Sequence, residues 1–183
     1  MLIAPFRELL SAYVPVDARE REFVARMHEL TLQDAPFHRR SFAPGHFTAS
    51  AFVLDPSRSC LLLILHKKLG LWLQPGGHVE PADDRAFAAA RREVAEETGL
   101  VELSPLLAGE QLFDVDIHSI PARREEDAHE HFDVRFAFVA RSRALAENDE
   151  VVDARWVPLS EVARVTSDES VLRAVRKLLA LVS

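Results

Sequence analysis

The sequence predicts an α/β protein in which a mixed β-sheet carries helices on both sides. Three observations lead to this class. Short apolar runs bounded by turn residues alternate with longer segments of helical periodicity. One helical segment, residues 84–98, lies between two groups of predicted strands, and another, residues 167–181, follows the last strand. With 183 residues, 48% of them hydrophobic, the chain can form one domain core with an appended segment.

Two helices are expected ahead of the first strand, at residues 5–13 and 17–31. Asp17 is a typical N-cap for the second helix, and Phe23 and Met27 lie on its apolar stripe. These helices predict an N-terminal helical extension, which can cover a functional site or form a homodimer interface. The pattern does not choose between the two roles.

The segment 32–46 contains two prolines and a Pro-Gly pair, so we expect a connector without regular structure. Arg39 in this connector can contact a substrate phosphate, although a solvated arginine beside a loop is the simpler interpretation. We place the boundary of the helical extension here, with residues 1–45 as the extension and residues 46–183 as the main domain.

Six strands are predicted from apolar runs or from β-branched and aromatic residues, at residues 47–54, 60–66, 71–74, 110–117, 132–141 and 151–158. Asp55-Pro56-Ser57 supplies turn residues between the first two strands. The second strand is almost wholly apolar. The two therefore predict a hairpin with a buried second arm, and Cys60, at the start of that arm, is expected to pack in the core.

Composition and charge disfavour several classes of function. The formal net charge of −7 argues against nucleic-acid binding, because that binding relies on neutralising backbone phosphates. The sequence has no run of about 18 apolar residues, so no membrane span is expected. The single cysteine cannot form an intrachain disulfide, and we therefore expect a cytoplasmic protein.

The helical segment 84–98 carries the most informative motif of the chain. Glu93, Glu96 and Glu97 are spaced i, i+3 and i, i+4, so a helix places their carboxylates on one face. Like charges at this spacing repel each other, and a bound hard cation would turn the repulsion into attraction. The motif therefore favours Mg²⁺, with Mn²⁺ as a second option, and phosphate chemistry. A solvated, glutamate-rich face is the alternative interpretation.

Residues around the motif strengthen the metal-binding interpretation. Gly76-Gly77 precedes the helix, where a backbone without side chains can approach a ligand closely. Arg92 comes directly before Glu93 and can hold a carboxylate in orientation. Gly99 ends the helix as a C′ residue. The opposite face of the helix is apolar and comprises Phe87, Ala90 and Val94.

Residues 76–100 resemble the signature motif of the Nudix hydrolase family. The run Arg92-Glu93-Val94-Ala95-Glu96-Glu97-Thr98-Gly99-Leu100 matches the second half of that motif at every fixed position. The first half has one extra residue and places Asp84 where the family has a glutamate. The resemblance implies the Nudix α/β/α sandwich with a mixed β-sheet, which agrees with the order of the predicted elements.

The resemblance also implies divalent-metal-dependent hydrolysis of a pyrophosphate bond in a nucleoside diphosphate linked to another moiety. It implies that Glu93, Glu96 and Glu97 are metal ligands and catalytic residues. It further implies that the Gly76 carbonyl is an additional ligand and that Arg92 orients a glutamate. In this family the general base is a glutamate of the motif or an acidic residue of a later loop.

A second polar stretch lies farther along the chain. His129, His131 and Asp133 alternate, so a strand places them on one face, where they can bind a divalent metal or a substrate phosphate. A solvent-facing strand start is the alternative. His78 follows the glycine pair and can reach substrate phosphates, although simple exposure also explains it. Candidate bases of the later loop cluster here and comprise Glu125, Glu126, Asp127, His129, Glu130, His131 and Asp133.

Two other functions fit the resemblance less well. A catalytically silent, nucleotide-sensing protein of the same fold would not need all three carboxylates. An isomerase of isoprenoid diphosphates would need a catalytic cysteine, whereas Cys60 opens an apolar strand. Sequence markers of the substrate subgroups of the family are absent after the motif, so the sequence does not name the substrate.

Overall fold

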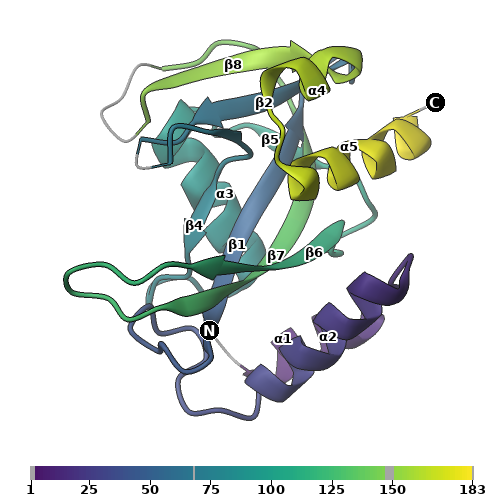
Figure 1. Cartoon of the computed structure of the whole chain (residues 1–183). Coiled ribbons are helices and arrows are strands. Elements are labelled where there is room, and N and C mark those ends of the chain that lie inside the picture. Colours follow the sequence, from purple (N-terminus) through teal and green to yellow (C-terminus); the bar gives the residue numbers. More distant parts are fainter. Residues whose placement is uncertain (1–2, 68, 147–150, 183) are drawn as a thin grey trace. The chain divides into compact units, whose positions relative to one another are not determined.

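The computed structural model describes residues 3–67, 69–146 and 151–182 (Figure 1). Its elements, in chain order, are α1 (Ile3–Ala12), α2 (Ala18–Leu30), β1 (Gly45–Leu54), β2 (Cys60–Leu65), β3 (Trp72–Leu73), β4 (Gly76–His78), α3 (Ala86–Thr98), β5 (Leu103–Pro105), β6 (Asp114–Ile120), β7 (His129–Ala140), β8 (Asp153–Pro158), η1 (Leu159–Glu161), α4 (Val162–Val165) and α5 (Glu169–Val182). The predicted α/β class is therefore confirmed.

The sheet has the strand order β3-β2-β1-β7-β5, and in addition β4 pairs with β1, β6 with β7 and β8 with β2. The chain groups into two compact units, and β1, β4, β7 and α3 contribute residues to both. The first unit comprises Met1–Ser50, Gly77–Ala90 and Gly109–Phe136. The second unit comprises Ala51–Gly76, Arg91–Ala108 and Ala137–Ser183.

In the first unit, β6 and β7 form an antiparallel pair, with Val115 opposite Val134. Strand β1 runs parallel to β7, because the Glu130 N–H donates to the Pro44 carbonyl at the start of both strands. The sheet is therefore mixed, as predicted. Figure 1 shows α1 and α2 side by side next to β6. Asp17 caps α2 as expected, since its side chain accepts from the Glu20 N–H at 2.8 Å.

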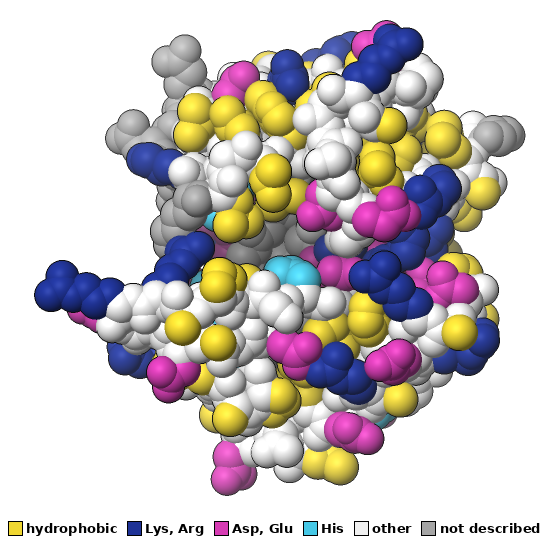
Figure 2. Space-filling view, in the orientation of Figure 1, with side chains coloured by type: hydrophobic (Ala, Val, Ile, Leu, Met, Phe, Trp, Pro, Cys, Tyr) yellow, Lys and Arg dark blue, Asp and Glu magenta, His cyan; other side chains and the backbone are white. Residues whose placement is uncertain are grey.

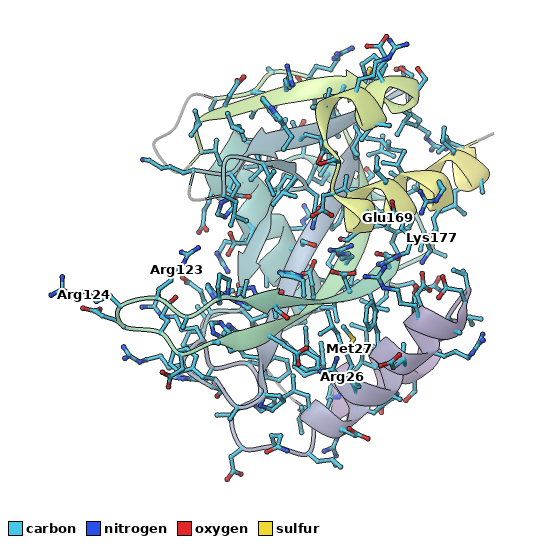
Figure 3. The ribbon with its side chains drawn as sticks, in the orientation of Figure 1. Arg26, Met27, Arg123, Arg124, Glu169 and Lys177 are labelled. Carbon is cyan, nitrogen blue, oxygen red and sulfur yellow. The ribbon has the colours of Figure 1, made fainter. Side chains whose placement is uncertain are left out.

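An aromatic core joins the two N-terminal helices to one face of these strands. The Phe6 ring of α1 lies 4.6 Å from the Phe47 ring of β1, edge to face. Arg26 of α2 forms an ion pair with Glu130. Its guanidinium also lies 5.4 Å from the Phe132 ring. Arg26 and its neighbour Met27 are labelled in Figure 3. Glu130 is therefore held on the face of β7 that α2 covers.

In the second unit, the apolar strand β2 is the central strand. It pairs with β1 through Leu54 and Leu61, with β3, and along its whole length with β8. Residues 60–64 are buried, so the predicted hairpin with a buried second arm is confirmed. Cys60 is buried and free. Helix α5 buries the apolar side of its sequence, which includes Val171, Ala174, Val175 and Leu178.

Several expected element boundaries were wrong, and three of them belong to strands that carry polar residues. Strand β1 begins at Gly45, so His46 belongs to a strand and not to the connector. Strand β6 covers residues 114–120 and not 110–117. Strand β7 begins at His129, ahead of its predicted start at Phe132. Polar residues on one face hide the starts of β1 and β7 and the end of β6 from a search for apolar runs.

Acidic and basic side chains are interspersed over the face of the molecule shown in Figure 2. Within the part of the chain that the structure describes, every helix is too short or too polar to cross a bilayer.

Candidate functional site

The glutamates of the motif lie on the polar side of α3. The other side of the helix is buried, with Phe87, Ala90 and Val94 all less than 10% exposed. This burial fixes the rotation of the helix and leaves the glutamates on the remaining face. The side chain of Glu93 is 13% exposed and that of Glu96 is 43% exposed, while Glu97 is buried. We call Glu93, Glu96 and Glu97 the glutamate set.

Two neighbours hold the glutamate set in place. Arg92 Nη1 lies 2.9 Å from Glu93 Oε1 and 2.7 Å from Glu96 Oε2. The Gly76 N–H donates a 2.9 Å hydrogen bond to Glu97 Oε2. Gly99 follows the helix with φ of +75°, as a C′ glycine does. The donor atoms of the set are therefore all oxygen, and their chemistry suits a hard divalent ion such as Mg²⁺.

Asp84, at the acidic position in the first half of the motif, differs in burial from its neighbour Asp83. Asp84 is exposed and pairs with Arg85 at 3.1 Å. This pairing lowers the pKa of the Asp84 carboxyl. Asp83 is buried and accepts from the Glu80 N–H at 2.8 Å, which closes the turn before α3. The extra residue of the motif thus falls in a turn that Asp83 stabilises.

The first unit gathers imidazoles from several strands. His129 and His131 of β7 meet His46 of β1, and each can offer one ligand atom such that all three atoms lie within 4.8 Å of one another. The ring of His46 is 5.1 Å from that of His129 and 4.8 Å from that of His131. We call His46, His129 and His131 the histidine cluster.

Two further imidazoles border the histidine cluster. The His78 ring of β4 lies 5.1 Å from the His46 ring and 5.2 Å from the His131 ring. The His118 ring of β6 lies 5.4 Å from the His131 ring. The predicted residues His78, His129 and His131 are thus brought together.

Two members of the histidine cluster, His46 and His131, are uncharged at neutral pH. Burial lowers the pKa of His131 to about 2, and the surrounding imidazoles lower it in the same direction. Burial also lowers the pKa of His46 to about 4, against the effect of its hydrogen bond to Ser41. Neutral imidazole is the form that binds metal ions, and it can also accept or donate a hydrogen bond.

Asp133 lies on the same face of β7 but is engaged elsewhere. Its two carboxylate oxygens accept from Thr48 Oγ1 at 3.1 Å and from Ser50 Oγ at 2.7 Å. Arg135 Nε lies 2.7 Å from the same carboxylate. Asp133 is almost fully buried, and it therefore serves a polar network rather than the histidine cluster.

Arg135 is the centre of that network. Its guanidinium also lies 3.1 Å from Asp114 and 3.4 Å from Asp116, both on β6. Burial opposes the charge of Arg135, but Asp133, Asp116 and Asp114 outweigh burial and raise the pKa of its guanidinium above the ordinary value. The polar face of these strands thus continues from imidazoles into a buried cluster of charges.

The remaining predicted residues lie in exposed segments. Arg39 is exposed in the connector. The candidate bases Glu125, Glu126 and Asp127 are exposed in the loop between β6 and β7. Figure 3 shows Arg123 and Arg124 at the tip of this loop.

Sequence reasoning missed His46 and His118. A signal for both was present, because polar residues alternate with apolar ones in each strand. On β1 the polar positions are His46, Thr48 and Ser50, and on β6 they are Asp114, Asp116 and His118. A search for strands with one polar buried face would have found these residues.

The mixed sheet and the acidic face of α3 define an α/β protein whose oxygen ligands suit a divalent cation. A family model described as the NUDIX domain matches residues 44–178. The chain belongs to the NUDIX family, as its motif indicated.

One known relative and two solved structures are similar to this chain. A Bacillus subtilis (strain 168) protein, provisionally named 8-oxo-dGTP diphosphatase, is 30% identical over 112 residues, which are 61% of this chain and 66% of that protein. A NUDIX-family hydrolase from Clostridium perfringens has a TM-score of 0.56 and 24% identity, covering 79% of this chain and 99% of that one. The NUDIX domain of Shewanella oneidensis NrtR complexed with ADP ribose has a TM-score of 0.57 and 18% identity. The match covers 86% of this chain and 98% of that one. These structural similarities show the fold.

Proposed function

We propose that the protein is a pyrophosphohydrolase that uses Mg²⁺, or Mn²⁺, to cleave the pyrophosphate bond of a nucleoside diphosphate linked to another moiety. The observation that supports the proposal most directly is the glutamate set. Three carboxylates share one face of α3, and Arg92 and the Gly76 N–H hold them in place. Family membership supports the same reaction.

We assign the following roles to individual residues. Glu93, Glu96 and Glu97 hold the cation, and the Gly76 carbonyl is a further ligand. A bound divalent ion would supply the positive charge that stabilises the phosphoryl oxygens during attack by water. Arg92 fixes the carboxylates of Glu93 and Glu96, and it thereby offsets part of the repulsion between them. Of the residues predicted to bind substrate, His78 and Arg39 are proposed to contact it directly.

The name of one relative supports the choice of substrates to test. The Bacillus relative bears the name of an enzyme acting on 8-oxo-dGTP, an oxidised nucleoside triphosphate. Nucleoside triphosphates therefore belong in a test panel beside nucleoside diphosphate sugars and dinucleoside polyphosphates. All three classes contain the pyrophosphate bond that the proposed reaction cleaves.

The test is product formation from this panel with Mg²⁺ and with Mn²⁺. We expect Glu97→Gln to lower kcat at least about a hundredfold, or about 2.7 kcal/mol, because it removes one charge from the ligands of the cation. Glu102→Gln is the matched control. Glu102 lies just beyond the end of α3, and its side chain is exposed and pairs with Arg141. Activity of Glu97→Gln within about twofold of wild type would reject the assignment. Nucleotide binding without hydrolysis of any panel member would instead favour a silent binding protein.

A further inference from the structure

The histidine cluster contains an unexplained buried atom. His46 is fully buried, and its Nε2 has no hydrogen-bond partner among the residues that the structure describes. A buried polar atom without a partner costs about 1–3 kcal/mol. Such an atom in a folded protein calls for an explanation, and a bound ion is one.

Hydrogen bonds orient two of the rings as ligands. The Nδ1–H of His46 donates to the Ser41 carbonyl at 3.2 Å, and the Nδ1–H of His129 donates to the Asp127 carbonyl at 2.7 Å. A carbonyl oxygen can only accept, so each Nδ1 carries the proton and each Nε2 keeps its lone pair. Metal-binding histidines commonly donate their second ring nitrogen to a backbone carbonyl in this way.

The third ring completes a set of nitrogen donors. His131 contributes the third ring, and one ring nitrogen of each histidine lies within 4.8 Å of the other two. Ligand nitrogens around a tetrahedral zinc ion are about 3.3 Å apart, because each zinc–nitrogen bond is about 2.0–2.1 Å long. Side-chain movements of about 1 Å would therefore close the set around an ion.

The chemistry of the donors selects the type of ion. Imidazole nitrogen suits zinc and its neighbours in the first transition row, whereas Mg²⁺ prefers oxygen. We propose that His46, His129 and His131 form a binding site for a zinc-class divalent ion. This site is separate in ligand chemistry from the glutamate set. Three imidazoles leave one position of a tetrahedral ion for water or for a substrate oxygen.

The test uses the whole protein and the metal alone. After treatment with chelator, wild type is titrated with Co²⁺, a coloured substitute for zinc, and zinc content is measured after dialysis against zinc. We expect about one equivalent of tightly bound ion and the visible absorption of four-coordinate cobalt. His46→Gln and His131→Gln should each weaken binding at least about tenfold, or about 1.4 kcal/mol.

Two control variants test whether a loss of ion binding is specific to the histidine cluster. His28→Gln replaces a half-buried histidine of α2 outside the cluster and should bind like wild type. Glu97→Gln should also keep the zinc-class ion, so loss of hydrolysis and loss of this site can be told apart. Wild type that takes up no ion, or cluster variants that bind as wild type does, would overturn the proposal.

Zinc-soaked crystals of wild type give an independent answer if the cluster variants do not fold. Anomalous scattering at the zinc edge should show a peak within bonding distance of all three rings. The absence of that peak, or a peak only at other residues, would reject the site.

Discussion

The glutamate set and the histidine cluster are built in different ways. The glutamate set lies on one helix, where i, i+3 and i, i+4 spacing alone brings three side chains together. The histidine cluster is assembled from two strands that are far apart in the sequence, and it depends on the pairing of β1 with β7. The first arrangement is therefore local, whereas the second is a product of tertiary structure.

The two groups also differ in charge and in exposure. The glutamate set is anionic, one member is largely exposed, and Arg92 pairs with two members. The histidine cluster is mostly buried, its members His46 and His131 are neutral at pH 7, and its strands lead into the Arg135 network. The comparison teaches that three ligands can be brought together either by the spacing along one helix or by the pairing of two strands. Substitutions near each group should therefore have different consequences.

The arginines beside the two groups give the largest expected contrast. Arg135→Met should lower the free energy of unfolding by about 3–5 kcal/mol, because it leaves three buried aspartates without their cation. Arg92→Met should cost less than about 1 kcal/mol, because its pairs are partly exposed and lie within one helix. Urea unfolding followed by circular dichroism measures both values. Equal losses would remove the proposed distinction between the two groups.

This difference explains how much the sequence could predict. The glutamates, Arg92 and the apolar face of α3 follow one short periodic pattern, so they could be identified and placed without any tertiary information. His129 and His131 were also found, because they alternate on one strand. His46 was not, because its position beside them depends on which strands pair and in what register. The role of Asp133 was missed for the same reason, since Thr48, Ser50 and Arg135 surround it only after folding.

A glycine beside the histidine cluster offers a second, smaller contrast. A Cβ at Gly45 would lie 1.8 Å from the Glu130 backbone oxygen, so Gly45→Ala must push β1 away from β7. We expect a loss of about 2–3 kcal/mol, as for overpacked cores. The shift would also separate His46 from its partners and weaken binding of the zinc-class ion.

Gly109→Ala is the control for this substitution. Gly109 has φ of +69° with open space around it, so only backbone strain of about 1–2 kcal/mol is expected. Thermal unfolding and zinc titration of both variants provide the measurements. If Gly45→Ala is no more destabilised than Gly109→Ala, the close approach of the two strands does not position His46.

A further contrast is the response of the metal-free protein to acid. The pKa of His46 falls to about 4 and that of His131 to about 2 in the folded state, because of burial and of the neighbouring rings of His78, His118 and His129. An unfolded histidine has a pKa of about 6.5, so below that pH the unfolded chain binds protons that the folded chain does not. The stability that these two residues contribute is therefore fully present above about pH 6.5 and is lost as the pH falls, towards 4 for His46 and towards 2 for His131. With chelator present, urea midpoints should decline across this window in wild type and decline less in His131→Gln. Identical slopes would mean that His131 takes up its proton equally in both states, and the cluster would then be more hydrated than the folded structure indicates.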